Sequence, residues 1–450
     1  MEITNTLMAL ADIAGLTVFS RLKDHPLLAA FRALLEALYR EDAVLGQVQS
    51  WAAFMDTFIR YNHSFYLSLA FLTITDDNPF THGVENREAL PPVLAALAKT
   101  DLSRLGRIAA FDVPGLGLCL GARLRKDGLE TLAGNIEEEA RALWAAEGKS
   151  SDLGKRLLEL FPEASDWGAA LSALSASIHR SGAGILGLHR SFRWVSSARP
   201  SPLKPVQNPD PVRLSDLAGY EAQRSVVTAN TRCFLEGKPA NNILLYGDRG
   251  TGKSATVKAV SNEYAHQGLR LLEVPKHDLF QLPGILETLA PRGLRFIIFI
   301  DDLSFETTDD SFTTLKALLE GGIAARPANV VLYATSNRRH LVKERLADRP
   351  SSAMAATGDV RAFDTMQEQF SLADRFGLTV VFAAPGQEEF LCIAEYIAFK
   401  RGTLKSPTPE ERTSFRENAL RWERWFNGRS PRTAVQYVDW VAGGAAFPWE

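Results

Sequence analysis

The residues with the clearest capacity for chemistry lie in a glycine-rich stretch between Gly247 and Ser254. Its eight positions fit the pattern G-x-x-x-x-G-K-[S/T], in which glycines let backbone N–H groups curl around phosphate oxygens. Lys253 is then expected to reach the β- and γ-phosphates of a nucleotide, and the hydroxyl of Ser254 to bind Mg²⁺. The stretch predicts a phosphate-binding loop with these cofactor-binding residues: Gly247, Gly250, Thr251, Gly252, Lys253 and Ser254.

Such a loop must join a strand to a helix. The apolar residues 243–246 before the loop predict a buried strand, and Val257, Val260 and Tyr264 recur at helical spacing after it. The helix N-terminus adds partial positive charge to the phosphate site. A chance glycine-rich turn is the alternative, and it explains neither the strand nor the helix.

A pair of carboxylates follows a second apolar run. The residues from Phe296 to Ile300 are typical of a strand that is covered on both faces of a parallel sheet, and Asp301 and Asp302 come directly after it. We expect Asp301 to hold Mg²⁺ through water as a metal residue together with Ser254, and Asp302 to activate the attacking water. A solvated acidic turn is the alternative.

The order of these motifs resembles that of an AAA+ ATPase over roughly the C-terminal half of the chain. The apolar strand 330–334 leads into ATSN, which resembles sensor 1, so the resemblance implies that Asn337 orients the attacking water. The segment SLADRFGLTVVF resembles the one that carries an arginine finger, and Arg375 falls at the matching position. Near the C-terminus, GRSPRTAVQYV resembles sensor 2, with Arg432 near the start of a helix that Ser430 would cap and Pro431 would begin.

The resemblance implies more about the nucleotide. The segment LSDLAGYEAQR resembles the one beside the base, which places Ala218, Gly219 and Tyr220 near the adenine. The implied cofactors are ATP and Mg²⁺, and a finger supplied in trans by Arg375 implies a homo-oligomer. Within AAA+ proteins, the string FIDDLSFE and the long leader resemble a bacterial family of ATPases whose biological role is unassigned.

These side chains also have plainer explanations. For Arg375 in the DRFG turn, the alternative to the finger is a surface ion pair, which contributes little. Asn337 is common in strand-end turns. Arg432 is unfavourable at a positive helix end unless an anion is nearby, which favours phosphate binding.

One position departs from the AAA+ pattern. Many AAA+ ATPases place Glu after the first aspartate of this strand, whereas this chain has Asp302, whose side chain is one methylene shorter. Glu306, four residues further on, supplies a longer arm if the segment is helical. We therefore expect slow hydrolysis with these catalytic residues: Asp302 or Glu306, Asn337, Arg375 and Arg432.

Composition limits the other possibilities. The formal net charge of −3 gives no global attraction to nucleic acid or acidic membranes. Cys119, Cys233 and Cys392 lie far apart, without metal-ligand or C-x-x-C spacing, which predicts buried thiols in a reducing compartment. The N-terminus lacks a basic targeting region, and no apolar run approaches the ~18 residues that span a bilayer. We expect a cytoplasmic protein without a membrane segment.

The chain divides into four predicted regions. Residues 1–196 form a mostly helical N-terminal domain, 197–212 a proline-rich linker, 213–386 the nucleotide-binding core and 387–450 a helical lid. Two apolar stripes predict N-terminal core helices: Leu27, Leu28, Phe31, Leu34, Leu35 and Leu38, then Trp51, Phe54, Met55 and Phe58. The stretch DVPGLGLCLGARL, with three glycines, predicts a turn or a short strand pair.

The predicted fold class is α/β, with a parallel sheet sandwiched by helices. Apolar strands alternate with helical segments after the linker, as such a sheet requires. An insert at about 341–369 interrupts the alternation and predicts a surface loop. In the lid, Thr408, Pro409 and Glu411 predict a capped helix start.

Two functions besides ATP hydrolysis remain open. A nucleotide-gated scaffold binds ATP with little turnover, which the short Asp302 side chain allows. A nucleic-acid loader would bind single strands with the arginines and tryptophans of the lid. Four glutamates in the same helix dilute its positive charge, which favours aromatic residues in the lid core beside a solvent-exposed charged face. The chain has no N-K-x-D segment to select guanine, which disfavours a GTPase. A small-molecule kinase is disfavoured because it would not explain the segments that resemble sensor 1, sensor 2 and the arginine finger. The N-terminal domain is expected to select an unknown protein substrate or partner.

Overall fold

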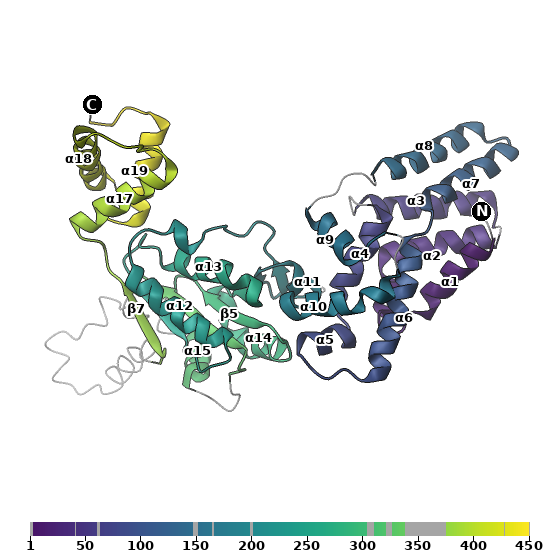
Figure 1. Cartoon of the computed structure of the whole chain (residues 1–450), viewed down its shortest axis with the longest axis horizontal. Coiled ribbons are helices and arrows are strands. Elements are labelled where there is room, and N and C mark those ends of the chain that lie inside the picture. Colours follow the sequence, from purple (N-terminus) through teal and green to yellow (C-terminus); the bar gives the residue numbers. More distant parts are fainter. Residues whose placement is uncertain are drawn as a thin grey trace. The chain divides into compact units, whose positions relative to one another are not determined.

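The structure is a computed structural model that describes residues 3–40, 42–60, 64–146, 152–163, 166–198, 201–303, 310–320, 326–337, 375–426 and 428–449 (Figure 1). The chain forms two compact units, Met1–Leu188 and His189–Glu450. The first is helical and the second contains the sheet.

Helices alone build the first unit within its described residues. Their bounds are α1 Ile3–Gly15, η1 Ser20–Asp24, α2 Pro26–Tyr39, α3 Val44–Ile59, α4 Phe65–Thr75, α5 Pro79–Glu85, α6 Pro92–Ala109, α7 Val113–Lys126, α8 Glu130–Ala146, α9 Asp152–Leu160, η2 Trp167–Ala170, α10 Leu171–Ser181 and α11 Gly184–Leu188. Among the described residues, no single helix is long and apolar enough to cross a bilayer. The helices α6 and α7, which bend by 46° where they meet, reach that length and apolar content only when they are taken together.

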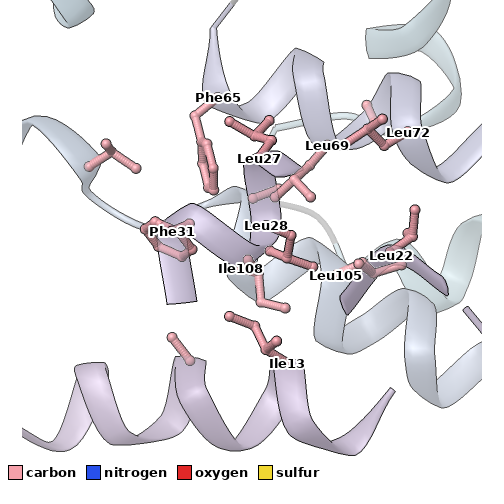
Figure 2. Close-up of a cluster of buried hydrophobic side chains, with 14 of the residues drawn as sticks. Ile13, Leu22, Leu27, Leu28, Phe31, Phe65, Leu69, Leu72, Leu105 and Ile108 are labelled. Atoms are coloured by element: carbon pink, nitrogen blue, oxygen red, sulfur yellow. The ribbon is translucent and has the colours of Figure 1, made fainter. Parts of the chain in front are cut away.

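The predicted apolar stripes form the core of this unit. Leu27, Leu28 and Phe31 of α2 are fully buried, and Figure 2 shows them facing apolar side chains of α1, α4 and α6, including Ile13 and Leu105. Trp51, Phe54 and Phe58 of α3 belong to the same cluster, and Met55 packs against it half-buried. Helical periodicity therefore identified the interior of this unit correctly.

The stretch DVPGLGLCLGARL is helical, contrary to the predicted turn or strand pair. It forms most of α7, and two of its three glycines, Gly117 and Gly121, lie where α7 meets α3 and α8. A Cβ on Gly117 would lie 2.6 Å from the ring of Trp51 and 2.7 Å from the Cβ of Ala140, and a Cβ on Gly121 would lie 2.6 Å from Cγ of Glu137. These glycines serve close helix packing, which a local sequence pattern does not distinguish from chain reversal.

A seven-stranded sheet organises the second unit, in the order β2-β1-β4-β5-β6-β3-β7. All neighbouring strands pair in parallel except β1 and β2, which are antiparallel. The strands are β1 Ser191–Trp194, β2 Leu203–Pro205, β3 Ile243–Gly247, β4 Leu269–Glu273, β5 Arg295–Ile300, β6 Val330–Ser336 and β7 Leu378–Phe382. Every residue of the interior strand β6 is buried, as expected for a parallel sheet that is covered on both faces.

Helices cover the sheet and position its loops. They are η3 Leu214–Asp216, α12 Glu221–Leu235, α13 Lys253–Tyr264, η4 Ala265–Gln267, η5 Lys276–Gln281, α14 Leu282–Leu289 and α15 Asp310–Glu320. Val227 of α12 and Val257 of α13 share one apolar cluster with alternate residues of β3 to β7, so these two helices cover the same face. Leu244 and Ile298, which point to the opposite face, are also fully buried.

Along the sequence, the boundary between the two compact units lies after Leu188, upstream of the predicted boundary at 196/197. Strand β1 lies within the predicted N-terminal domain, yet it pairs with β4. Strand β2 lies within the predicted linker and pairs with β1. The prolines of this stretch are compatible with β2 because it is the edge strand, where a missing backbone N–H costs no ladder hydrogen bond.

The C-terminal helices form a lid with its own apolar core. They are α17 Gln387–Arg401, α18 Pro409–Trp425 and α19 Pro431–Gly443 (Figure 1). Thr408 and Glu411 form the predicted capping box of α18, and the hydroxyl of Ser430 accepts from the backbone N–H of Thr433 at the start of α19. The α/β fold class, with a helical lid and a helical N-terminal region, is confirmed.

Candidate nucleotide-binding site

The glycine-rich loop lies between β3 and α13, as its pattern predicts. Gly247, Gly250 and Gly252 all have positive φ angles, of 144°, 79° and 91°, which L-residues with side chains rarely adopt. A Cβ on Gly247 would lie 2.0 Å from the carbonyl oxygen of Phe382. Gly252 is the N-cap of α13 and supplies no side-chain cap, so the first N–H groups of α13 lack an intrahelical partner and point to the loop.

Lys253 is buried at the base of this loop. Its Nζ donates to the carbonyl oxygens of Gly247 at 2.9 Å and Asp248 at 2.7 Å, and to Oδ1 of Asn337 at 3.0 Å. Burial lowers the pKa of Lys253, while the negative charges of Asp248, Asp301 and Asp302 oppose that shift. A desolvated ammonium group beside open helix N–H groups is suited to an incoming phosphate.

Ser254 and Asp301, which come from different strand ends, meet beside the loop. The hydroxyl of Ser254 donates to Oδ1 of Asp301 at 2.6 Å. Because β3 and β5 both pair in parallel with β6, their carboxyl ends lie at one edge of the sheet. Hydroxyl and carboxylate oxygens are ligands that Mg²⁺ prefers, and this pair therefore fits Mg²⁺.

Asn337 connects Asp302 to Lys253. Its Nδ2 donates to Oδ1 of Asp302 at 2.7 Å, while its Oδ1 accepts from Lys253. An ammonium only donates and a carboxylate only accepts, so the orientation of this amide follows from its two neighbours. Asp302 also has a positive φ of 51°, and such unusual backbone conformations cluster at functional sites.

Two residues of this site were missed in the sequence. The hydroxyl of Thr335 in β6 donates to Oδ1 of Asp301 at 2.5 Å, and Oδ2 of Asp248 accepts from the N–H of Ala384 at 2.7 Å. Asp248 thereby ties the loop to the chain that leads from β7 into the lid. Their partners lie 34 and 136 residues away in sequence, so no local pattern indicates either contact.

The predicted base segment lies where the core meets the lid. Gly219 has a φ of 70°, and a Cβ there would lie 2.9 Å from Cδ1 of Ile393 in α17. The hydroxyl of Tyr220 donates to the carbonyl oxygen of Ala383 at 2.6 Å, and its ring lies 5.2 Å from that of Phe382. Burial and the charges of nearby carboxylates raise the pKa of Tyr220 to about 12, so the hydroxyl stays protonated and remains a donor.

The start of α19 contacts the loop directly. The backbone N–H of Arg432 donates to the carbonyl oxygen of Gly250 at 3.2 Å, and the positive charge of Arg432 contributes to lowering the pKa of Lys253. The side chain of Arg432 is exposed. This places a second cation beside the phosphate-binding loop.

Arg375 is not part of this cluster. It lies three residues before β7, and β7 starts in register with β3, since Leu378 pairs with Ile243. The loop follows the other end of β3, so Arg375 lies at the opposite edge of the sheet, about 15 Å away for a five-residue strand. Glu306, the alternative water-activating residue, and the insert at 341–369 lie outside the described residues.

The loop at the carboxyl edge of a parallel sheet, the acidic strand end and the helical lid together give a P-loop fold with the AAA+ organisation predicted above. The chain belongs to the family described as "Protein of unknown function (DUF815)", which matches residues 188–445. That match covers the second compact unit almost completely and leaves the helical first unit outside it.

Similarity to solved structures is distant. The Holliday junction branch migration motor RuvB of Thermotoga maritima is 15% identical, with a TM-score of 0.29, over 51% of this chain and 71% of that chain. Two single-substitution variants of the same protein, with 16% and 15% identity, give the same TM-score and coverage. No curated protein matches the chain in sequence.

Proposed function

We propose that this protein binds ATP with Mg²⁺ and hydrolyses it slowly. The observation that carries the proposal is the hydrogen-bonded chain from Lys253 through Asn337 to Asp302, next to the Ser254–Asp301 pair. It joins the phosphate-binding lysine to the group that would activate water. Such a connection serves hydrolysis and is not needed for binding alone.

In this proposal the loop holds the nucleotide. The open N–H groups at the start of α13 and the ammonium of Lys253 bind the phosphates, while Gly219 and Tyr220 lie beside the base. Ser254 and Asp301 would hold Mg²⁺, the carboxylate of Asp301 through water. When bound, Mg²⁺ neutralises charge that develops on the phosphate oxygens.

The carboxylate of Asp302, or of Glu306, accepts the proton of the attacking water, and Asn337 orients that water. For this, the bond between Asn337 and Asp302 must open so that a water fits between them. Arg432 adds positive charge from the lid in the same subunit.

Arg375 is proposed to act on a neighbouring copy of the chain. Its place at the far edge of the sheet from its own loop supports an action in trans, because the side chain cannot cover about 15 Å. The active form is then a homo-oligomer in which each site is completed by its neighbour. The helical N-terminal unit would contact a protein substrate or partner. The predicted burial of the three cysteines is wrong, because Cys119 and Cys233 are half-buried and Cys392 is exposed, but their lack of disulfides supports a reducing, cytoplasmic location.

The test is ATP turnover at several protein concentrations for wild type, Lys253→Ala and Arg375→Ala. We expect specific activity of wild type to rise with concentration, and both variants to lose it while only Lys253→Ala loses ATP binding. Equal specific activity in Arg375→Ala and wild type would refute the role in trans. Activity retained by Lys253→Ala would refute the proposed site.

A nucleotide-gated scaffold is the second candidate. It is favoured by the side chain of Asp302, which is one methylene shorter than the glutamate of many AAA+ ATPases and so reaches less far toward an attacking water. Tight Mg²⁺–ATP binding by wild type without turnover at any concentration would support it.

A nucleic-acid loader is less favoured. Arg412 and Arg416 form ion pairs with Glu395, and Trp422 is buried in the lid core, so these three side chains do not form the basic and aromatic surface that single strands require. The exposed candidates that remain are Trp425 and Phe426 beside Arg421 and Arg424. Its test is salt-sensitive binding of single-stranded DNA that is lost when Arg421 and Arg424 are both replaced by Gln.

A further inference from the structure

Thr335 has one hydroxyl that contacts both aspartates of the candidate site. Its Oγ1 donates to Oδ1 of Asp301 at 2.5 Å and accepts from the backbone N–H of Asp302 at 3.0 Å. Its carbonyl oxygen also accepts from the N–H of Leu303 at 2.7 Å. The side chain is buried, with 2% of its surface exposed, so these contacts are made without competition from bulk water.

Strand register explains why the side chain of Thr335 lies beside the two aspartates. Strand β6 lies between β3, which leads into the phosphate-binding loop, and β5, which leads into the two aspartates. Ala334 pairs with Ile300, and Thr335 pairs with Leu245 of β3. Thr335 is therefore the β6 residue directly beyond the last β5 pair, level with Asp301.

The contacts fix both the side chain of Asp301 and the backbone of Asp302. Oδ1 of Asp301 accepts from two hydroxyls, of Thr335 and Ser254, which holds the carboxylate in one orientation. The N–H of Asp302 is held by Thr335 while that residue adopts its left-handed backbone conformation. A single hydroxyl thus contacts both the carboxylate of Asp301 and the backbone that carries the side chain of Asp302.

We propose that Thr335 is a positioning residue that presets Asp301 for Mg²⁺ and Asp302 for water, without touching either ligand itself. The inference rests on the proposed function and assigns to β6 a role in metal affinity. Outer residues that hydrogen-bond to metal ligands commonly change metal affinity by about 10- to 100-fold when they are replaced.

The experiment compares Thr335→Val with Thr335→Ser. Valine keeps the shape and removes the hydroxyl, whereas serine keeps the hydroxyl and removes a methyl group. Binding of a fluorescent ADP analogue is titrated with MgCl₂, and affinity is also measured in EDTA. We expect Thr335→Val to need about tenfold more Mg²⁺ for half-maximal tightening of binding, with unchanged affinity in EDTA, and Thr335→Ser to stay close to wild type.

A matched control separates positioning from loss of stability. Thr231→Val also removes a fully buried hydroxyl from the same unit, one that donates to the carbonyl oxygen of Val227 and bonds to Tyr333 in β6. We expect it to lower the melting temperature without changing the Mg²⁺ midpoint. A wild-type Mg²⁺ midpoint in Thr335→Val, or an equal shift in Thr335→Ser or Thr231→Val, would overturn the inference.

The same titration distinguishes this inference from the proposed function. If wild type binds Mg²⁺–ADP but does not turn over ATP, the proposed hydrolysis is refuted. The role of Thr335 is then still tested by the Mg²⁺ midpoints of the variants. Wild type that shows no Mg²⁺-dependent binding overturns both.

Discussion

Among the candidate catalytic residues that the structure describes, Asp302 has the least ordinary geometry. It has a left-handed backbone, a short side chain, and a carboxylate that accepts from Asn337. Aspartate and asparagine tolerate this backbone conformation better than longer residues do, because their short polar side chains bond locally. The departure from Glu at this position is therefore consistent with the backbone that the site adopts.

Replacement of Asp302 by Asn tests its charge at constant shape. Asp302→Asn keeps the left-handed preference and removes the proton acceptor, so we expect ATP turnover to fall by about 10²- to 10⁴-fold while ATP affinity changes little. Steady-state turnover and equilibrium binding measure the two effects. Turnover within a few-fold of wild type would instead favour Glu306 as the group that activates water.

At the residue scale, sequence patterns identified the side chains that are close in sequence to a motif. Lys253, Ser254 and Asp301 were found because each belongs to a short pattern beside an apolar run. Thr335 and Asp248 were missed because their roles depend on which strands are neighbours, and register is set by packing across the whole sheet. The position of Arg375 at the far edge of the sheet was likewise not visible in the sequence.

The glycines of α7 illustrate how an element can oppose its own helix propensity. Glycine in a helix interior costs roughly 0.5–1 kcal/mol relative to alanine. Gly117 is retained against that cost where α7 approaches Trp51 and Ala140 closely. Helical periodicity identified α2 and α3 correctly, but the same method gave a turn for α7 because the close neighbours are far away in sequence.

Two glycine-to-alanine substitutions in neighbouring helices should change the free energy of unfolding in opposite directions. We expect Gly117→Ala to destabilise the N-terminal unit by about 1–3 kcal/mol through overpacking. A Cβ on Gly134 of α8 meets nothing within 4 Å, so Gly134→Ala should stabilise the unit by about 0.5–1 kcal/mol. Thermal or urea unfolding measures both, and a stabilising Gly117→Ala would show that α7 and α8 separate readily.

The lid should weaken in acid. Hydrogen bonding from Arg412 lowers the pKa of Glu395 below its usual 4.5, against an opposing effect of burial. A lowered folded-state pKa gives stability that is present above about pH 4.5 and is lost as the pH falls through the folded value. Hydrogen exchange of α17 and α18 amides at neutral and acidic pH should show this loss in wild type.

The matched variant for that measurement is Glu395→Gln, which cannot titrate. We expect its lid to exchange faster than wild type at neutral pH, because Arg412 and Arg416 lose their partner, and to change less between the two pH values. An equal acid response in both proteins would assign the effect to other carboxylates.

At the scale of the whole molecule, only one of the two compact units contains the candidate site. ATP with Mg²⁺ should therefore stabilise the unit His189–Glu450 and leave the helical unit unaffected. At a ligand concentration of 100 times Kd, the gain is about 2.7 kcal/mol. Calorimetry with and without nucleotide should show one transition moving upward and one staying fixed, and a single transition that shifts as a whole would indicate that the units unfold together.

The division of the chain was the large-scale property that composition described least well. Proline content identified a segment that differs from its surroundings, but it did not show that β1 and β2 on either side of Val195–Ala198 belong to the sheet. Strand pairs between distant segments are fixed by the sheet that receives them, and short strands such as these have no periodicity of their own.

The same two strands protect one edge of the sheet from self-association. With them in place, the outer strand at the edge opposite β7 is the three-residue β2, which contains Lys204 and Pro205, both features that block further strand pairing. A fragment that starts at residue 213, where composition places the core, would leave the apolar strand β4 as an open sheet edge. Such a fragment is expected to aggregate through β4, whereas a fragment that starts at residue 189 keeps β1 and β2, which cover that edge of β4.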